Sequence, residues 1–190
     1  MDNEEKKQKS TAKEILNFIL YIVAVLLATY LIVHYVGQRT VVVGESMRET
    51  LQDGDNLVVD KISYAIHDPE RFDIIVFPYE YSEETYYIKR IIGLPGETVQ
   101  ITADGTIMID GKELKEDYGR EVMEVRGLAA KPITLGEDEY FVLGDNRNES
   151  EDSRYEDVGL IKRKDIIGRA ILRIYPFSSF GKINNKNGKD

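Results

Sequence analysis

The chain has 190 residues, 42% of them hydrophobic, with 25 Lys and Arg against 34 Asp and Glu, a formal net charge of −9, two His and no Cys. These values describe one ordinary domain. The lack of Cys excludes disulfide frameworks, thiol nucleophiles and Cys-ligated metal clusters. The presence of only two His argues against a histidine-based metal site. The acidic balance argues against a nucleic-acid-binding surface, which needs a basic footprint, so any chemistry must use hydroxyls, carboxylates, Lys or Arg, and we expect neither metal nor cofactor.

The first predicted element is a transmembrane anchor over residues 15–36. Its apolar run from Ile15 to Val33 holds 19 residues, none of them charged. Such a run is just long enough to cross a hydrocarbon core of about 30 Å as a helix. A buried globular helix would be shorter and would carry a polar stripe. A cleaved secretory signal would end in a small-x-small site, which YLIVHYVGQ lacks. We therefore expect an uncleaved anchor.

The charges on either side of this anchor predict its orientation. Residues 1–14 carry four Lys, whereas only Arg39 lies close to the other end. Lys and Arg next to a span resist translocation, and acidic residues count for little. We expect residues 1–14 to be cytoplasmic and the chain from residue 37 onward to lie outside.

Short β-branched and aromatic runs, separated by Gly, Asp and Pro, follow the anchor and predict an antiparallel, mostly β protein. The Asp104-Gly105 and Asp110-Gly111 pairs predict tight hairpin turns, because both residue types tolerate positive φ. Leu94-Pro95-Gly96 predicts another turn. The predicted strands are 39–43, 56–61, 72–77, 86–92, 98–102, 106–109, 121–126, 139–143 and 166–175.

The composition of the residues that follow the predicted anchor indicates how they are organised. Residues 97–138 are more charged and hairpin-like, which indicates a small inserted β subdomain. The β core then comprises residues 37–96 and 139–180. The tail 181–190 is rich in Asn, Lys and Gly, and we expect it to be disordered.

Ser46 is a candidate nucleophile, because in VVVGESMRETL it follows an apolar strand and a glycine. The alternative is an ordinary Ser in a post-strand turn. A Ser hydroxyl needs a base to accept its proton. His67 lies in the loop IHDPER and reads as a surface residue, so a Ser-His-Asp triad has little support and a Ser-Lys pair remains.

Lys89 is the candidate base. In YYIKRIIG, strand alternation places Tyr87, Lys89 and Ile91 on one face, which is otherwise apolar. An ammonium group on that face would lose water, and its pKa would fall. The alternative is an edge-strand Lys that points to solvent.

The loop GDNRNESEDSR, residues 144–154, is the third candidate segment. It gathers acidic, basic and hydroxyl side chains directly after the strand YFVL. It reads either as a solvated turn-rich loop or as a cluster that holds a buried Lys in place. An EF-hand reading fails, because the alternating acidic ligands and the terminal Glu are absent.

These segments together resemble the bacterial type I signal peptidase (leader peptidase) family, in its short Gram-positive-like form. Four motifs occur in order behind the anchor: GESMRETL, GDNLVVDKIS, YIKRIIGLPGETV and GDNRNESEDSR. The resemblance extends to about Pro176, and it implies an antiparallel β catalytic core with a small inserted β subdomain.

The resemblance also implies residue roles. Ser46 matches the nucleophile and Lys89 the general base. Ser150 and Asp152 match residues that orient the lysine, and the residues that match a supporting ionic network are Asp145, Arg90 and Arg154. The residues implied to line the substrate pockets are Val42, Met47, Leu51, Tyr87 and Ile88; ordinary core packing is the alternative for each.

The chain departs from the family pattern at two positions. Gly44 stands where some members carry a hydroxyl that donates to the oxyanion, so the backbone N–H of Ser46 needs help from another backbone or water donor. Glu49 stands where the family usually has Pro in S-M-x-P-T-L. We expect Glu49 to remove the stiffness that proline would give the turn, and to alter rate or substrate tolerance.

The activity implied by the resemblance is removal of signal peptides from exported preproteins after small-x-small sites, by a monomer in the plasma membrane. Its partners would be those preproteins and membrane lipid. Two alternatives remain: a catalytically impaired, anchored β module that binds peptides, and a Ser-Lys protease for a dedicated partner.

Overall fold

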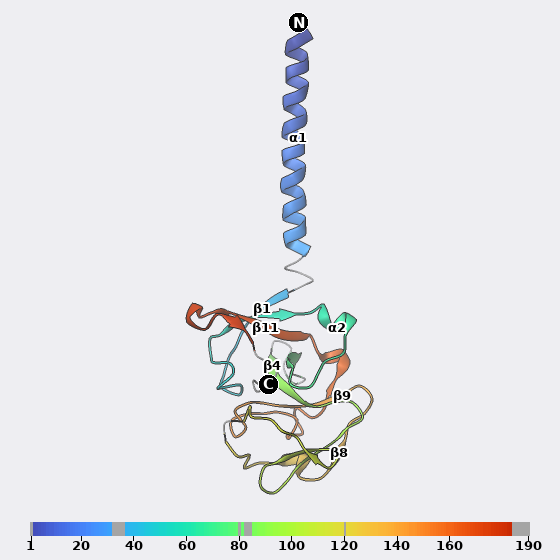
Figure 1. The fold of residues 1–190 in the computed structure, drawn as a ribbon, viewed down its shortest axis with the longest axis vertical. Helices are drawn as coiled ribbons and strands as arrows, with labels where there is room; N and C mark the ends of the chain where they lie inside the picture. Colours follow the sequence, from blue (N-terminus) through green and yellow to red (C-terminus); the bar gives the residue numbers. More distant parts are fainter. Residues whose placement is uncertain (1, 32–36, 80, 82–84, 120, 184–190) are drawn as a thin grey trace. The chain divides into compact units, whose positions relative to one another are not determined.

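Figure 1 shows the computed structural model, which describes residues 2–31, 37–79, 81, 85–119 and 121–183. The chain divides into two compact units, residues 1–38 and residues 39–190.

The first unit consists mainly of helix α1, Asp2–Leu31. Its segment Lys13–Tyr30 is the one described helix that is long and apolar enough to cross a membrane. The apolar side chains of this segment are exposed, Phe18 and Leu26 each to 64%. Residues 32–36 of the predicted anchor lie outside the described residues.

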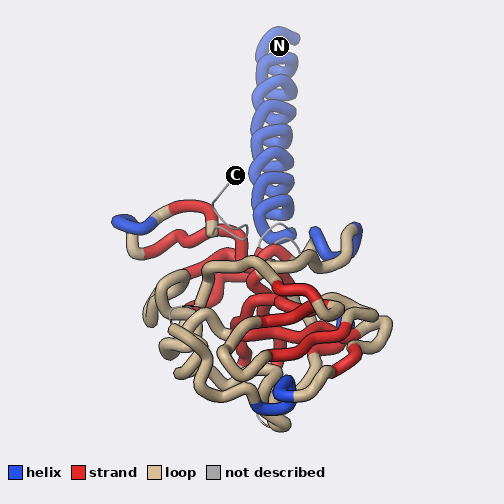
Figure 2. Tube along the Cα trace, turned by 60° about the horizontal axis from the view of Figure 1, so that its bottom comes forward, coloured by secondary structure: helices blue, strands red, loops and turns tan. Residues whose placement is uncertain are grey.

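The second unit is built around an antiparallel sheet, which confirms the predicted fold class. The strand order is β1-β2-β11-β3-β4-β9-β10, and β12 also pairs with β11. In Figure 2 irregular loops, in tan, connect many of these strands. The strands are β1 (Gly37–Val41), β2 (Asn56–Asp60), β3 (Ile74–Pro78), β4 (Tyr86–Gly93), β9 (Glu139–Leu143), β10 (Ile161–Lys162), β11 (Gly168–Tyr175) and β12 (Gly181–Lys182).

A second sheet of four strands, in the order β7-β6-β5-β8, lies within residues 97–138. Asp110 and Gly111 have φ values of 50° and 74° and connect β6 to β7, so the predicted tight hairpin is confirmed. Gly96 has a φ of 79° in the predicted Leu94-Pro95-Gly96 turn. The strands are β5 (Thr98–Ile101), β6 (Ile107–Ile109), β7 (Lys112–Glu113) and β8 (Ile133–Thr134).

The two sheets share a hydrophobic core. Val99 and Ile101 from the small sheet pack in one cluster with Ile92, Phe141 and Leu143 from the large sheet. Burial of this shared apolar surface is what holds residues 97–138 onto the rest of the unit. Two further clusters lie within the large sheet; one of them contains Ile75, Phe77 and Ile91, and the other contains Met47, Leu51 and Ile74.

The predicted strand 121–126 is wrong. These residues form bends before the short helix η2 (Gly127–Ala130). Their backbone bonds to a side chain of another loop: the Asn148 Oδ1 accepts the Glu124 N–H at 3.0 Å, and its Nδ2 donates to the Val122 carbonyl at 3.1 Å. The remaining short helices are α2 (Ser63–Ile66), η3 (Arg163–Asp165) and η4 (Phe177–Ser179).

The predicted tail also differs at its start. Gly181 and Lys182 form β12 opposite Arg173 and Leu172, and Ile183 is buried in the core. An apolar side chain at residue 183 gives this end of the chain surface to bury, which the polar composition of the tail concealed. Residues 184–190 lie outside the described residues.

Candidate active site

Ser46 lies in a turn that follows β1. Gly44 has a φ of 92°, and its N–H donates to Asp53 Oδ1 at 2.8 Å, so the chain bends away from the strand direction at this point. The Leu51 N–H then donates to the Met47 carbonyl at 2.8 Å, which closes one helical turn directly after the serine. A glycine is favoured at residue 44, because other residues rarely adopt this φ.

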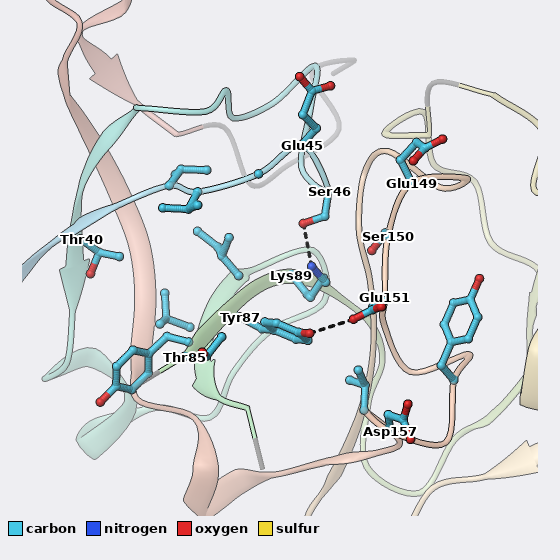
Figure 3. Close-up of a pocket in the computed structure, with 18 of the residues that line it drawn as sticks. Thr40, Glu45, Ser46, Thr85, Tyr87, Lys89, Glu149, Ser150, Glu151 and Asp157 are labelled. Carbon is cyan, nitrogen blue, oxygen red and sulfur yellow. Dashed lines mark hydrogen bonds between the residues drawn. The ribbon is translucent and has the colours of Figure 1, made fainter. Parts of the chain in front are cut away.

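Lys89 lies next to this serine, as Figure 3 shows. Its Nζ donates to Ser46 Oγ at 2.7 Å, and the residue is only 3% exposed. Burial lowers the pKa of the Lys89 amine from 10.5 to about 8, against the opposing charges of three carboxylates, of which Asp152 has the largest effect. At that pKa about one lysine in ten is neutral at pH 7, compared with about one in several thousand for a free lysine.

The alternation predicted for β4 holds. Lys89 lies opposite Ile75 on β3 and Tyr87 lies opposite Phe77, so the two share a face. The Lys89 Nζ lies 5.0 Å from the centre of the Tyr87 ring. The alternative of a Lys that points to solvent is contradicted by its burial. The partial loss of water at this amine is the physical cause of its lowered pKa.

The loop 144–154 carries a buried ionic network beside the lysine. Arg90 pairs with Asp145, with Nε to Oδ1 at 2.8 Å and Nη2 to Oδ2 at 2.7 Å. Arg154 pairs with Asp152, with Nε to Oδ1 at 2.7 Å and Nη2 to Oδ2 at 2.8 Å. All four side chains are fully buried or 1% exposed. The reading of this segment as a solvated loop is therefore contradicted.

Ser150 and Asp152 lie close to the lysine without a hydrogen bond to it. Ser150 is 7% exposed, and within the described part of the chain its Oγ has no hydrogen-bond partner. The Asp152 Oδ2 accepts the Gly144 N–H at 3.1 Å as well as the Arg154 guanidinium. Any effect of Asp152 on Lys89 in this structure is therefore through charge, and it raises the pKa of the lysine.

Two residues of the site were missed from the sequence. Gly144 faces the serine so closely that a Cβ there would lie 2.2 Å from Ser150 Oγ and 2.5 Å from the Ser46 carbonyl oxygen. Thr50 donates its hydroxyl to Asp145 Oδ2 at 2.5 Å. The signal for Gly144 was its place immediately after a strand in GDNR. The signal for Thr50 was its place in the motif GESMRETL, where it matches the T of S-M-x-P-T-L.

A groove of about 840 Å³ opens beside Ser46 and Lys89. Val42, Tyr87 and Ile88 line it, and Tyr87 donates its hydroxyl to Glu151 Oε2 across it at 2.9 Å (Figure 3). Among the residues that the structure describes, those of β4 before Arg90 pair with β3 on one side only, because the pairs with β9 start at Arg90. The lining residues are 40–46, Val76, 85–89, 148–151, Tyr155, Asp157 and Val158.

Met47 and Leu51 do not line this groove. They are 1% and 0% exposed and pack in a core cluster with Leu57 and Ile74. The helical turn after Ser46 directs both side chains inward. For these two residues the structure therefore shows core packing, which was the alternative to a pocket role. His67 is exposed and is also absent from the lining of the groove.

Glu49 differs from expectation in its backbone. Its φ is 84°, in the left-handed region. Proline fixes φ near −65°, so a proline could not stiffen this turn in the conformation seen here. The sequence argument assumed a backbone that accepts proline, and the structure contradicts that assumption.

No group of three or more His, Asp or Glu side chains that could hold a metal ion is found in the described ranges of the chain. The site presents a buried amine hydrogen-bonded to a hydroxyl, beside a groove that is lined in part by β4.

Comparisons with known proteins identify the family to which this chain is similar. The family profile described as "Signal peptidase, peptidase S26" matches residues 15–175. A "Signal peptidase I" from Leptolyngbya laminosa is 40% identical over 156 residues, which cover 78% of this chain and 74% of that protein. "Signal peptidase I T" from Bacillus subtilis is 37% identical and covers 93% of both chains. The crystal structure of a signal peptidase I from Enterococcus faecalis is 38% identical, with a TM-score of 0.43, and covers 55% of this chain and 97% of that one.

Proposed function

Because the chain belongs to the signal peptidase family, peptidase S26, we propose that it is a membrane-anchored serine endopeptidase that removes signal peptides from exported preproteins with Ser46 as nucleophile and Lys89 as general base. The observation that carries the proposal is the contact of 2.7 Å between Lys89 Nζ and Ser46 Oγ, made by an amine that is 3% exposed. A Ser hydroxyl reacts only when a nearby base takes its proton.

The proposed reaction is acyl transfer in two steps. Neutral Lys89 accepts the proton of the Ser46 hydroxyl while Ser46 Oγ bonds to the scissile carbonyl carbon. The tetrahedral intermediate then collapses, the peptide C–N bond breaks, and the leaving amine takes the proton from Lys89. A water molecule, deprotonated by Lys89, attacks the acyl-enzyme ester and releases the new carboxylate and the Ser46 hydroxyl.

The oxyanion of the intermediate requires donors that are fixed in place. The Ser46 N–H is the proposed first donor. Gly44 has no side chain to supply a second, and its N–H is already bonded to Asp53. A water molecule or another backbone N–H must therefore provide the second donor.

The supporting residues act on the lysine through the loop. In this proposal the Arg90–Asp145 and Asp152–Arg154 pairs hold the loop 144–154 against Lys89 and keep the amine away from water. The unpartnered Ser150 Oγ lies within the same groove and is available to the lysine when its proton moves. Network residues of this kind fix the geometry of the reacting groups.

The substrate is proposed to bind as an added strand. The free edge of β4 before Arg90 offers backbone groups to an extended peptide, and Val42, Tyr87 and Ile88 offer apolar contacts beside it. Shallow pockets of this kind suit the small side chains of a small-x-small cleavage site. Met47 and Leu51 would support the pockets from the core.

The anchor places the enzyme where its substrates are. We propose that the segment Lys13–Tyr30 spans the plasma membrane with the N-terminus in the cytoplasm, as the four Lys of residues 1–14 favour. A preprotein that is held in the same membrane then meets the enzyme at a high effective concentration.

Cleavage of a model preprotein by the purified full chain in detergent tests the proposal. We expect the wild type to release a mature protein with a new N-terminus after a small-x-small site, and Ser46→Ala and Lys89→Ala each to abolish release. Wild-type protein that is folded but cleaves none of a panel of preproteins would leave only a peptide-binding module. Cleavage of a single partner and no others would favour a dedicated protease.

A further inference from the structure

A short segment of residues 97–138, Glu116 to Tyr118, contacts the loop that surrounds the candidate active site. It follows β7 and precedes η2, far from Ser46 and Lys89 in the sequence. Neither the motifs of the sequence nor the reaction described above uses these residues.

Glu116 forms a forked ion pair with Arg147 of the loop 144–154. The distances are 2.8 Å from Nη1 to Oε1 and 2.9 Å from Nη2 to Oε2. The side chains of Arg147 and Glu116 are only 3% and 10% exposed. The Glu116 Oε2 also accepts the Tyr118 N–H at 2.9 Å, which holds the turn of residues 116–118.

Arg147 links Glu116 to the backbone of Gly144, which lies against the serine. Its Nε donates to the Gly144 carbonyl at 3.1 Å. Gly144 is the residue whose missing Cβ would clash with the Ser46 carbonyl oxygen and with Ser150 Oγ. Three successive contacts therefore join the Glu116 carboxylate to the backbone of Ser46: Glu116 with Arg147, Arg147 with Gly144, and Gly144 with Ser46.

The Tyr118 ring packs against Arg90, which is a second arginine of the site besides Arg147. The Arg90 Cζ lies 3.5 Å from the centre of the Tyr118 ring, a cation–π contact. Arg90 directly follows Lys89 in β4 and pairs with Asp145. The Tyr118 hydroxyl is buried and has no hydrogen-bond partner within the described residues, so the ring itself makes the contact.

We propose that Glu116 and Tyr118 are positioning residues of the active site, and that the inserted segment holds Arg147 and Arg90 so that Ser46 and Lys89 stay in contact. The inference rests on the proposed function for its meaning in catalysis. A displacement of about 1 Å between reacting groups can lower the rate about a hundredfold. The contacts of Glu116 and Tyr118 with the two arginines can therefore affect the reaction although neither residue touches Ser46 or Lys89.

Substitution of Glu116 tests the proposal, with Glu113→Gln as the matched control, because Glu113 is an exposed carboxylate at the end of β7, three residues before Glu116. For Glu116→Ala we expect kcat per folded molecule to fall by about tenfold or more. KM should change by less than about threefold, because the residue does not line the groove. Glu116→Gln keeps one acceptor oxygen and should retain more activity than Glu116→Ala.

The pH profile separates positioning from mere folding. The charged groups that act on Lys89 are Asp152, Glu151, Asp145 and Arg154. If the loop moves away, the lysine gains water, its pKa rises, and the pH at which the rate is half-maximal moves upward. Tyr118→Leu should shift the profile in the same direction, and Tyr118→Phe, which keeps the ring, should shift it less.

A direct titration of Lys89 tests the positioning role without depending on cleavage of a preprotein. NMR of a sample labelled at the lysine side chains gives the pKa of Lys89 in the wild type, Glu116→Ala and Tyr118→Leu, whether or not a preprotein is cleaved. An unchanged pKa, together with kcat within about twofold of the wild type for Glu116→Ala and Tyr118→Leu, would overturn the proposal. Wild-type inactivity with a shifted Lys89 pKa in the variants would instead overturn the proposed function alone.

Discussion

Arg90 and Asp145 form a doubly hydrogen-bonded ion pair in which neither side chain is exposed, with distances of 2.8 and 2.7 Å. Arg90 follows Lys89 in β4, and Asp145 follows Gly144 at the end of β9. The pair therefore joins the strand that carries the buried amine to the loop that faces the serine.

Asp145→Asn should strongly destabilise the protein. Removal of one partner from a buried ion pair leaves an uncompensated charge, at a cost of about 3–5 kcal/mol. The free energy of unfolding in urea, measured on the full chain in detergent, checks this value. Glu45→Gln is the control, because its pair with Arg48 has side chains that are 59% and 50% exposed, and such pairs contribute about 1 kcal/mol or less. Equal losses for the two variants would contradict the assignment.

The rate of cleavage should follow the neutral form of Lys89. Because burial lowers the pKa of this amine to about 8, kcat/KM should rise about tenfold per pH unit below that value and level off above it. Measurement between about pH 6 and 10 gives the midpoint. A rate that is independent of pH across this range would mean that another group accepts the proton.

The same pKa predicts how stability depends on pH. The folded-state pKa of about 8 lies below the ordinary value of 10.5, so between these values the unfolded chain binds more protons and the free energy of unfolding rises with pH. The penalty, about 3 kcal/mol, is fully present below pH 8 and is gone above 10.5. Lys89→Met should therefore be more stable than the wild type at pH 7, and the difference should shrink toward pH 10.5. Lys112→Met, at an exposed lysine, is the control for the exchange of Lys for Met itself.

Gly144→Ala should remove activity while the control Gly181→Ala leaves it intact. A methyl group at residue 144 would lie 2.2 Å from Ser150 Oγ and 2.5 Å from the Ser46 carbonyl, whereas nothing lies within 4 Å of the corresponding position at Gly181. We expect kcat to fall by about a hundredfold or more, because the serine backbone must shift. Full activity of Gly144→Ala would show that the loop can move without consequence.

Glu49→Pro should destabilise the turn. The φ of 84° at this residue excludes proline, so the variant should lose more than about 1 kcal/mol of unfolding free energy. Glu49→Gly, which adopts this φ without strain, should be more stable than Glu49→Pro. Denaturant unfolding of both variants measures the difference, and a Glu49→Pro variant as stable as the wild type would mean that the turn has another conformation.

Local patterns predicted much of the fold. Alternation and β-branched runs predicted β2, β4 and β9 closely. These strands bury one or both faces, and a buried face carries apolar residue types that are visible in the sequence. The hairpin at Asp110 and Gly111 was predictable because few other residue types accept its φ values. The segment 121–126 looked like a strand, but it had no strand to pair with, and its backbone bonds to Asn148 instead.

The sequence by itself determined the apolar run of the candidate membrane span, the antiparallel class and the ordered motifs that hold Ser46 and Lys89. Each run, strand and motif depends on residue types within one short stretch. Only the tertiary structure decided that Lys89 is buried away from water and that Met47 and Leu51 pack in the core. It also decided that Glu116 pairs with Arg147 and that the Tyr118 ring packs against Arg90. Burial and ion pairing join residues that lie 31 to 55 positions apart, as between Glu116 and Arg147 or Arg90 and Asp145. Such contacts depend on how strands and loops pack in three dimensions, and no periodicity along the chain encodes them.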